Sequence, residues 1–179
     1  KFSIDELDDI IKCAVENAKR AREESNGAQH KWVALDIGPL GRMLKPLGDL
    51  DFEDAVSTFK TTVEIGVKYG VDLILIETMN DCYETKAAVL AAKENSSLPV
   101  FVTNTYDENG KLMTGANPAA MIAMLEGLGA DAIGMNCSLG PKQMAEIVPE
   151  FAKFSSVPIF VNSNAGLPRS VNGKTVFVF

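Results

Sequence analysis

Short apolar segments recur along this chain at intervals of roughly 30 residues, the length of one strand and one helix in a parallel α/β fold. The expected strands begin near positions 32, 71, 99, 130 and 158, and they are apolar throughout. Continuous apolar strands are typical of a parallel sheet that is covered on both faces. The sequence therefore predicts one α/β domain over residues 1–179, in which five strands alternate with helices.

Amphipathic segments occupy the intervals between the expected strands. A first helix is predicted to begin with a capping box at Ser3 and Glu6 and to run to about Glu24, with its apolar side chains on one face. Others are predicted after Asp51, over residues 86–93, and over 118–128 and 141–154, each of which opens with proline. The predicted core-facing positions are Leu7, Ile10, Ile11, Ala14 and Ala18 in the first helix and Val56, Phe59, Val63 and Val67 in the second.

Polar residues follow each expected strand. They are Asp36; Glu77 and Thr78; Thr103, Asn104 and Thr105; Asn136 and Cys137; and Asn162, Ser163 and Asn164. An open doubly wound sheet is the alternative architecture, but residues 37–41 lack the glycine spacing of a dinucleotide-binding turn. Polar residues at the carboxyl ends of several strands are what a (β/α)8-barrel active site requires. A barrel is therefore the predicted fold, although strand ends are also polar wherever a chain leaves its core.

The charge balance argues against polyanionic partners. The chain has 17 basic and 24 acidic residues, a net charge of −7, so nucleic acid and anionic membranes would be repelled. No apolar run approaches the roughly 20 residues that a membrane-spanning helix needs. Three widely spaced cysteines suit a reducing compartment, so a cytoplasmic location is expected. The first residue is lysine and no secretory signal is visible, so a start inside a longer polypeptide is also expected.

Cys137 carries the sharpest chemical hypothesis. It follows a strand and precedes a proline-opened helix, where a thiolate or a metal-bound sulfur would be accessible. A buried structural cysteine is the equally compatible alternative. Cys13 and Cys82 are expected to be structural, and His30 is expected to be solvated and without a role.

Five segments, in this order, resemble the homocysteine S-methyltransferase family and look most like the homocysteine-binding domain of bacterial cobalamin-dependent methionine synthases. They are Asp36-Ile37-Gly38-Pro39, Ile76-Glu77-Thr78, Leu112-Met113-Thr114-Gly115, Gly134-Met135-Asn136-Cys137-Ser138-Leu139-Gly140-Pro141 and Asn164-Ala165-Gly166-Leu167-Pro168. The resemblance implies a TIM (β/α)8 barrel of which this chain holds the third to seventh strands. It also implies an enzyme, a methyltransferase.

The resemblance implies a reaction and a set of site residues. In the family, three cysteine thiolates bind zinc, and the zinc-bound homocysteine thiolate accepts a methyl group, here from methylcobalamin, to give methionine. Carried over, Cys137 would be a zinc ligand in the catalytic centre, and Glu77 would bind the homocysteine ammonium group. Asn164 would be a weaker metal contact. The substrate pocket would be shaped by Asp36, Thr78 and Asn136.

Two departures from the family pattern shape the expectations for this chain. The family's other two zinc cysteines lie in a Gly-Gly-Cys-Cys-Gly segment that residues 1–179 do not contain, so the isolated chain is expected to bind zinc poorly and to be inactive. Residues 174–179 alternate like a strand, where the family would begin an acidic helix. The expected partners are homocysteine, the folate and cobalamin domains of a parent polypeptide, and a second copy through open sheet edges.

Other functions remain open from the residues alone. A betaine- or S-methylmethionine-dependent homocysteine methyltransferase would share the same segments. A phosphate-handling or Schiff-base barrel enzyme is a further alternative, but no lysine stands at an expected strand end. A structural or interaction module is the noncatalytic alternative.

Overall fold

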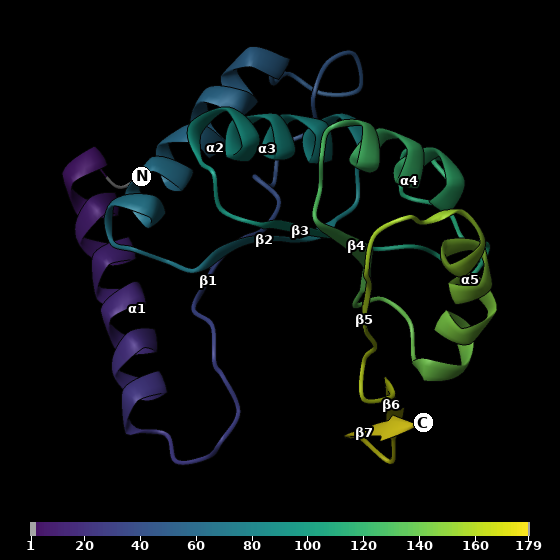
Figure 1. The fold of residues 1–179 in the computed structure, drawn as a ribbon. Helices are drawn as coiled ribbons and strands as arrows, with labels where there is room; N and C mark the ends of the chain where they lie inside the picture. Colours follow the sequence, from purple (N-terminus) through teal and green to yellow (C-terminus); the bar gives the residue numbers. More distant parts are fainter. Residues whose placement is uncertain (1–2, 179) are drawn as a thin grey trace.

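The computed structural model describes residues 3–178. They form one five-stranded sheet with five helices, followed by a small two-stranded hairpin (Figure 1). The helices are α1 (Ile4–Glu24), α2 (Phe52–Lys68), α3 (Cys82–Asn95), α4 (Pro118–Gly127) and α5 (Pro141–Phe154). The strands are β1 (Ala34–Ile37), β2 (Leu73–Met79), β3 (Val100–Asn104), β4 (Ala132–Asn136), β5 (Ile159–Asn162), β6 (Leu167–Val171) and β7 (Lys174–Val178). None of the helices described is long and apolar enough to cross a bilayer.

The main sheet is parallel, and its strand order is β1-β2-β3-β4-β5. A doubly wound sheet reverses its strand order part-way across, whereas a barrel adds each strand beside the previous one. The order therefore confirms the predicted barrel arrangement. Figure 1 shows the sheet as an arc, with helices along its convex side and its concave side open.

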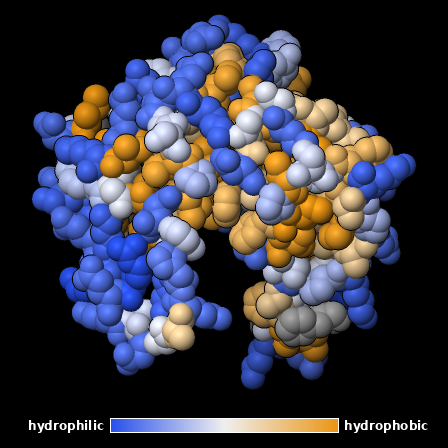
Figure 2. All heavy atoms as spheres, viewed as in Figure 1, coloured by the Kyte–Doolittle hydropathy of each residue, from blue (hydrophilic) through white to orange (hydrophobic). Residues whose placement is uncertain are grey.

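The concave side gives the outer strands less cover than the sequence predicted. β4 is buried on both faces, but β1 alternates between exposed and buried residues, and Ile159 and Val161 of β5 are both exposed. The prediction of a sheet covered on both faces is therefore wrong for β1 and β5, because none of the described helices packs on the concave face. Space-filling atoms show the molecule hollowed beneath the sheet, with apolar side chains above the hollow (Figure 2).

Strand boundaries shift by one to three residues from the expected ones. β1 starts after Trp32, whose side chain is 65% exposed and lies beside the exposed His30 ring at a centroid distance of 4.1 Å. β2 extends to Met79, so Glu77 and Thr78 belong to the strand itself. The predicted strand after position 174 is confirmed as β7, which pairs with β6 in an antiparallel hairpin; Phe179 lies outside the described residues.

The capping box of α1 is confirmed, because the Ser3 and Glu6 side chains each accept the other residue's backbone N–H. The predicted apolar face is only partly buried, since Ile11 and Val15 are the buried residues of this helix. Ile10 is 46% exposed, and Ala14 and Ala18 are exposed. α1 packs on α2 at one end of the sheet, so only a narrow stripe of its surface is buried.

Helix α2 buries Phe59 and Val63 as predicted, but Val67 is 37% exposed. Each step of four residues turns an α-helix about 40° past a full rotation, so Val67 has rotated away from the face that Phe59 buries. Ile65 and Gly66 are buried in its place. Asp51 is the N-cap, although its carboxylate pairs with Lys45 instead of a helix N–H.

The rotation of α2 predicts different costs for the same truncation one helical turn apart. We expect Val63→Ala to lower the free energy of unfolding by about 2 kcal/mol, because two buried methyl groups are lost and a cavity remains. Val67→Ala, the matched control, should change the free energy of unfolding by less than about 0.5 kcal/mol. Urea denaturation of the three proteins measures both values, and equal losses would contradict the assigned helix face.

Candidate active site

The carboxyl ends of β1, β2 and β4 bring most of the predicted site residues to one edge of the sheet. Parallel pairing explains this, because every strand of a parallel sheet ends at the same edge. Asp36 on β1 is in register with Leu75 on β2, so Glu77, two residues later, points to the same face of the sheet as Leu75. Asn136 closes β4, and Cys137 follows it directly.

Asp36 and Glu77 form an acidic pair within reach of each other's charge. Glu77 is half-buried, and that burial, followed by the negative charge of Asp36, raises the pKa of Glu77; the Thr78 hydroxyl acts in the opposite direction. Partial burial likewise raises the pKa of Asp36, although solvent still reaches its side chain. Among residues 3–178, neither carboxylate takes part in an ion pair. The pair is therefore suited to receive a cation.

The Asn136 side chain connects three strands. Its oxygen accepts hydrogen bonds from the Thr78 backbone N–H at 2.9 Å and from the Thr103 hydroxyl at 2.8 Å. Its amide nitrogen donates to the Thr78 hydroxyl at 2.7 Å and lies 3.5 Å from the Cys137 sulfur. Thr78, Asn136 and Cys137, which the sequence assigned to one site, are thus in direct contact.

Three residues at this edge adopt left-handed backbone conformations without being glycine. The φ angles are 60° at Thr78, 56° at Cys137 and 58° at Ser138. A left-handed conformation costs an L-residue about 1–2 kcal/mol, and a β-branched threonine adopts it rarely. Such strain persists only where surrounding contacts enforce it, and it concentrates at functional sites.

Cys137 is half-buried, and its backbone N–H donates to the Asn162 carbonyl at 3.1 Å, which ties the loop to the end of β5. The two other thiols lie elsewhere. Cys13 is exposed on α1, and Cys82 opens α3 with its sulfur 3.5 Å from that of Met124. Of the two interpretations of Cys137, partial exposure favours an accessible thiol over a buried structural one.

Asn164 is joined to the Cys137 loop through the backbone. Its N–H donates to the Leu139 carbonyl at 3.0 Å. Its side chain is half-buried and lines a hollow of about 530 Å³ together with Pro168 and Phe177. The assignment of Asn164 as a metal contact stays a prediction.

The donor set for a metal is incomplete in the part of the chain that is described. Residues 3–178 contain no group of three or more histidine, cysteine, aspartate or glutamate side chains placed to hold a metal ion. A catalytic zinc site needs three protein ligands and one open position. Cys137 therefore fits as a single ligand, and the described residues do not fit a complete zinc site.

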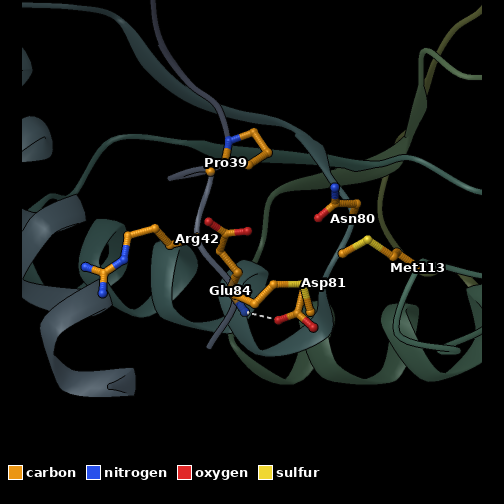
Figure 3. Close-up of a pocket in the computed structure, with 8 residues that line it drawn as sticks. Pro39, Arg42, Asn80, Asp81, Glu84 and Met113 are labelled. Carbon is orange, nitrogen blue, oxygen red and sulfur yellow. Dashed lines mark hydrogen bonds between the residues drawn. The ribbon is translucent and has the colours of Figure 1, made fainter. Parts of the chain in front are cut away.

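Two hollows lie beside these strand ends, and Asp36, Glu77, Asn136 and Cys137 line neither of them. One, of about 230 Å³, is lined by the residues labelled in Figure 3. Its two buried carboxylates serve the fold: Asp81 accepts the Glu84 N–H at 2.7 Å, and Glu84 accepts the Leu40 N–H at 2.6 Å. The other, of about 530 Å³, shares Asn80 and Met113 with the first and reaches Ser138.

Thr103 is the site residue that sequence reasoning missed. It is fully buried in β3, and its hydroxyl is one of the donors to Asn136. Its position at a strand end was visible in the sequence, but nothing there distinguished it from Asn104 and Thr105. Asn104 instead donates to the Met79 carbonyl and the Thr85 hydroxyl, which joins β3 to β2 and α3.

The sequence profile of the homocysteine S-methyltransferase family matches residues 1–178. The chain belongs to this family of methyltransferases. Its sequence is 32% identical over 170 residues to the methionine synthase of Mycobacterium leprae and 31% identical over 171 residues to that of Mycobacterium tuberculosis. Each match covers 92% of the chain and 14% of the relative, so the chain spans a small part of those proteins.

Solved homocysteine methyltransferases have the same fold. The metallated form of MmuM from Escherichia coli superposes with a TM-score of 0.82 at 22% identity, over 92% of this chain and 61% of MmuM. Its apo form gives a TM-score of 0.81 over 62% of MmuM. The likeness confirms that β1 to β5 and their helices form part of a (β/α)8 barrel.

The acidic pair predicts a coupled titration. We expect Asp36→Asn to lower the pKa of Glu77 toward its ordinary value, because one negative neighbour is removed while burial persists. Carboxyl ¹³C NMR of Glu77 against pH measures the shift. Asp107→Asn on the β3–α4 loop is the matched control and should leave the pKa of Glu77 unchanged.

The same substitution has an expected sign for stability. A carboxyl whose pKa is raised by folding destabilises the folded protein at neutral pH, and this penalty disappears as the pH falls through the raised pKa. Asp36→Asn should therefore raise the free energy of unfolding at pH 7, and the difference should vanish in acid. A loss of stability at pH 7 would contradict the assigned acidic pair.

Proposed function

We propose that this chain forms the homocysteine-binding wall of a homocysteine S-methyltransferase. Glu77 binds the substrate ammonium group, and Cys137 provides one sulfur ligand to the metal beside which the substrate sulfur is placed. The observation that carries the proposal is the Asp36–Glu77 pair, which lies at the same sheet edge as the Cys137 thiol and has no cationic partner among residues 3–178.

The acidic pair suits an ammonium ion better than a metal. A primary ammonium carries one positive charge and three N–H donors, so two carboxylates from adjacent strands can share it. Its charge also relieves the repulsion between Asp36 and Glu77. Binding of an amino acid is therefore coupled to release of a proton wherever the carboxyls are partly protonated, and affinity falls as the pH falls through their raised pKa values.

Zinc is the metal proposed for this family, and it would hold the homocysteine sulfur as a thiolate at neutral pH. Of the three cysteines in residues 3–178, only Cys137 lies at this sheet edge. Asn164 is the proposed weaker ligand. The remaining ligands must come from other parts of a complete enzyme. The bond from the Cys137 N–H to the Asn162 carbonyl, which holds the loop at the strand edge, supports this role.

Methylcobalamin is the proposed methyl donor. The two mycobacterial relatives are methionine synthases, which supports a parent polypeptide with further folate- and cobalamin-binding domains. None of the residues described here is assigned to the donor. Methionine would be the product.

Removal of the Glu77 charge tests the ammonium contact. We expect Glu77→Gln to weaken binding of L-homocysteine at least tenfold at pH 7.5, because the half-buried carboxylate is the proposed principal partner of the ammonium. Chemical-shift titration of ¹⁵N-labelled protein measures the dissociation constants. Glu108→Gln on the β3–α4 loop removes an exposed charge and should leave binding unchanged. Equal affinities of wild type and Glu77→Gln would contradict the proposed role.

Metal titration tests the incomplete donor set. We expect the 179-residue chain to bind zinc more weakly than micromolar, since one thiolate and one amide provide too few ligands. Competition with a chromophoric chelator measures the affinity. Sub-micromolar binding of one zinc per chain that is lost in Cys137→Ala would contradict this expectation; Cys13→Ala is the matched thiol control.

A further inference from the structure

The hydrogen-bonding capacity of the Asn136 side chain is used up within the protein. A primary amide has two N–H donors and an oxygen that accepts two hydrogen bonds. The oxygen accepts from the Thr78 N–H and the Thr103 hydroxyl, and the nitrogen donates to the Thr78 hydroxyl and contacts the Cys137 sulfur. The residue is only 3% exposed. Asn136 therefore has no polar group left for a bound substrate.

The partners of Asn136 come from strands that do not all touch. β2 and β4 are separated by β3 in the sheet, so the Asn136 amide spans β3 to reach Thr78 on β2. Thr103, on the intervening strand, donates its hydroxyl hydrogen to the amide oxygen. One side chain thus links the carboxyl ends of three consecutive strands.

The link reaches residues that hold left-handed conformations. Asn136 binds Thr78 at both its backbone N–H and its hydroxyl, and Thr78 has a φ of 60°. Glu77 precedes Thr78 directly, so the backbone turn at Thr78 determines where the strand presents Glu77. Cys137, with a φ of 56°, follows Asn136 directly and contacts its amide.

We infer that Asn136 is a positioning residue that fixes the separation between the Glu77 carboxylate and the Cys137 thiol. The inference rests on the proposed function for the roles of Glu77 and Cys137. In an amino-acid thiol, a fixed number of carbon atoms separates the amine from the sulfur. A carboxylate and a metal-binding thiol held at one separation therefore select substrates by chain length, and Asn136 sets this selection without touching the substrate.

Asn104 provides a matched control. It is another fully buried asparagine at the end of a neighbouring strand, and it also bonds across strands. Its amide contacts Met79 and Thr85, and neither Thr78 nor Cys137. Asn104→Leu therefore removes the same chemical group at similar burial. It controls for effects that come only from a general loss of stability.

The decisive experiment compares Asn136→Leu with Asn104→Leu in the 179-residue chain. Positive φ brings the amide and α protons of a residue close together, so the intensity of the intraresidue HN–Hα nuclear Overhauser (NOE) cross-peak of Thr78 reports its backbone conformation. We expect this cross-peak to weaken in Asn136→Leu and to stay strong in Asn104→Leu. The rate of Cys137 alkylation by iodoacetamide at fixed pH, relative to Cys13, should change at least threefold in Asn136→Leu alone.

Thr103 variants keep the test informative if Asn136→Leu does not fold. Thr103→Val is nearly isosteric and removes one donor to Asn136, whereas Thr103→Ser keeps the hydroxyl. Thr103→Val should reproduce part of both changes, and Thr103→Ser should restore wild-type values. A Thr78 cross-peak and a Cys137 rate that are unchanged in both Asn136→Leu and Thr103→Val would overturn the inference.

Ligand binding separates this inference from the proposed function. If wild type binds homocysteine, Asn136→Leu should weaken that binding at least tenfold while Asn104→Leu does not, and unchanged binding would overturn the positioning role. If wild type binds no homocysteine, the proposed function fails. The Thr78 and Cys137 measurements still decide in that case whether Asn136 holds the two strand ends.

Discussion

Parallel pairing of the strands in chain order is the constraint on which the rest of the structure depends. It sends the carboxyl ends of β1 to β5 to one edge, so Thr78 and Asn136, which are 58 positions apart, bond to each other there. The pairing of β4 with β5 needs a glycine, because a Cβ at Gly134 would lie 1.8 Å from the Phe160 carbonyl oxygen. Gly134 thus brings β5 close enough to tie the Cys137 loop through Asn162.

Polar groups at this edge fall into two classes, which differ in whether the protein itself satisfies them. Asn136 is buried with its amide fully engaged, as stability requires of a buried polar group. Asp36 and Glu77 instead keep carboxylates that repel each other and have no cation among the described residues. In the proposed function, the first class holds the geometry of the site and the second binds the ligand.

The fold was predictable where local signals agree with tertiary packing. The capping box at Ser3, the proline-opened helices and the apolar strands all formed near their expected positions. Errors appear where burial depends on a distant partner. Ile10 on α1 and Val67 on α2 follow an apolar period, yet the period does not say how wide a stripe the neighbouring element covers.

The sequence by itself determined the strand-and-helix alternation, the polar strand ends and the family, because these depend on the order and spacing of residues along the chain. It placed Asp36, Glu77, Thr78, Asn136 and Cys137 in one predicted site. Only the tertiary structure decided what each one contacts. The left-handed turn at Thr78 and three of the four interactions of Asn136 depend on residues 33 or more positions apart, and the strand register that joins them is set by packing of the whole sheet and leaves no local trace in the sequence.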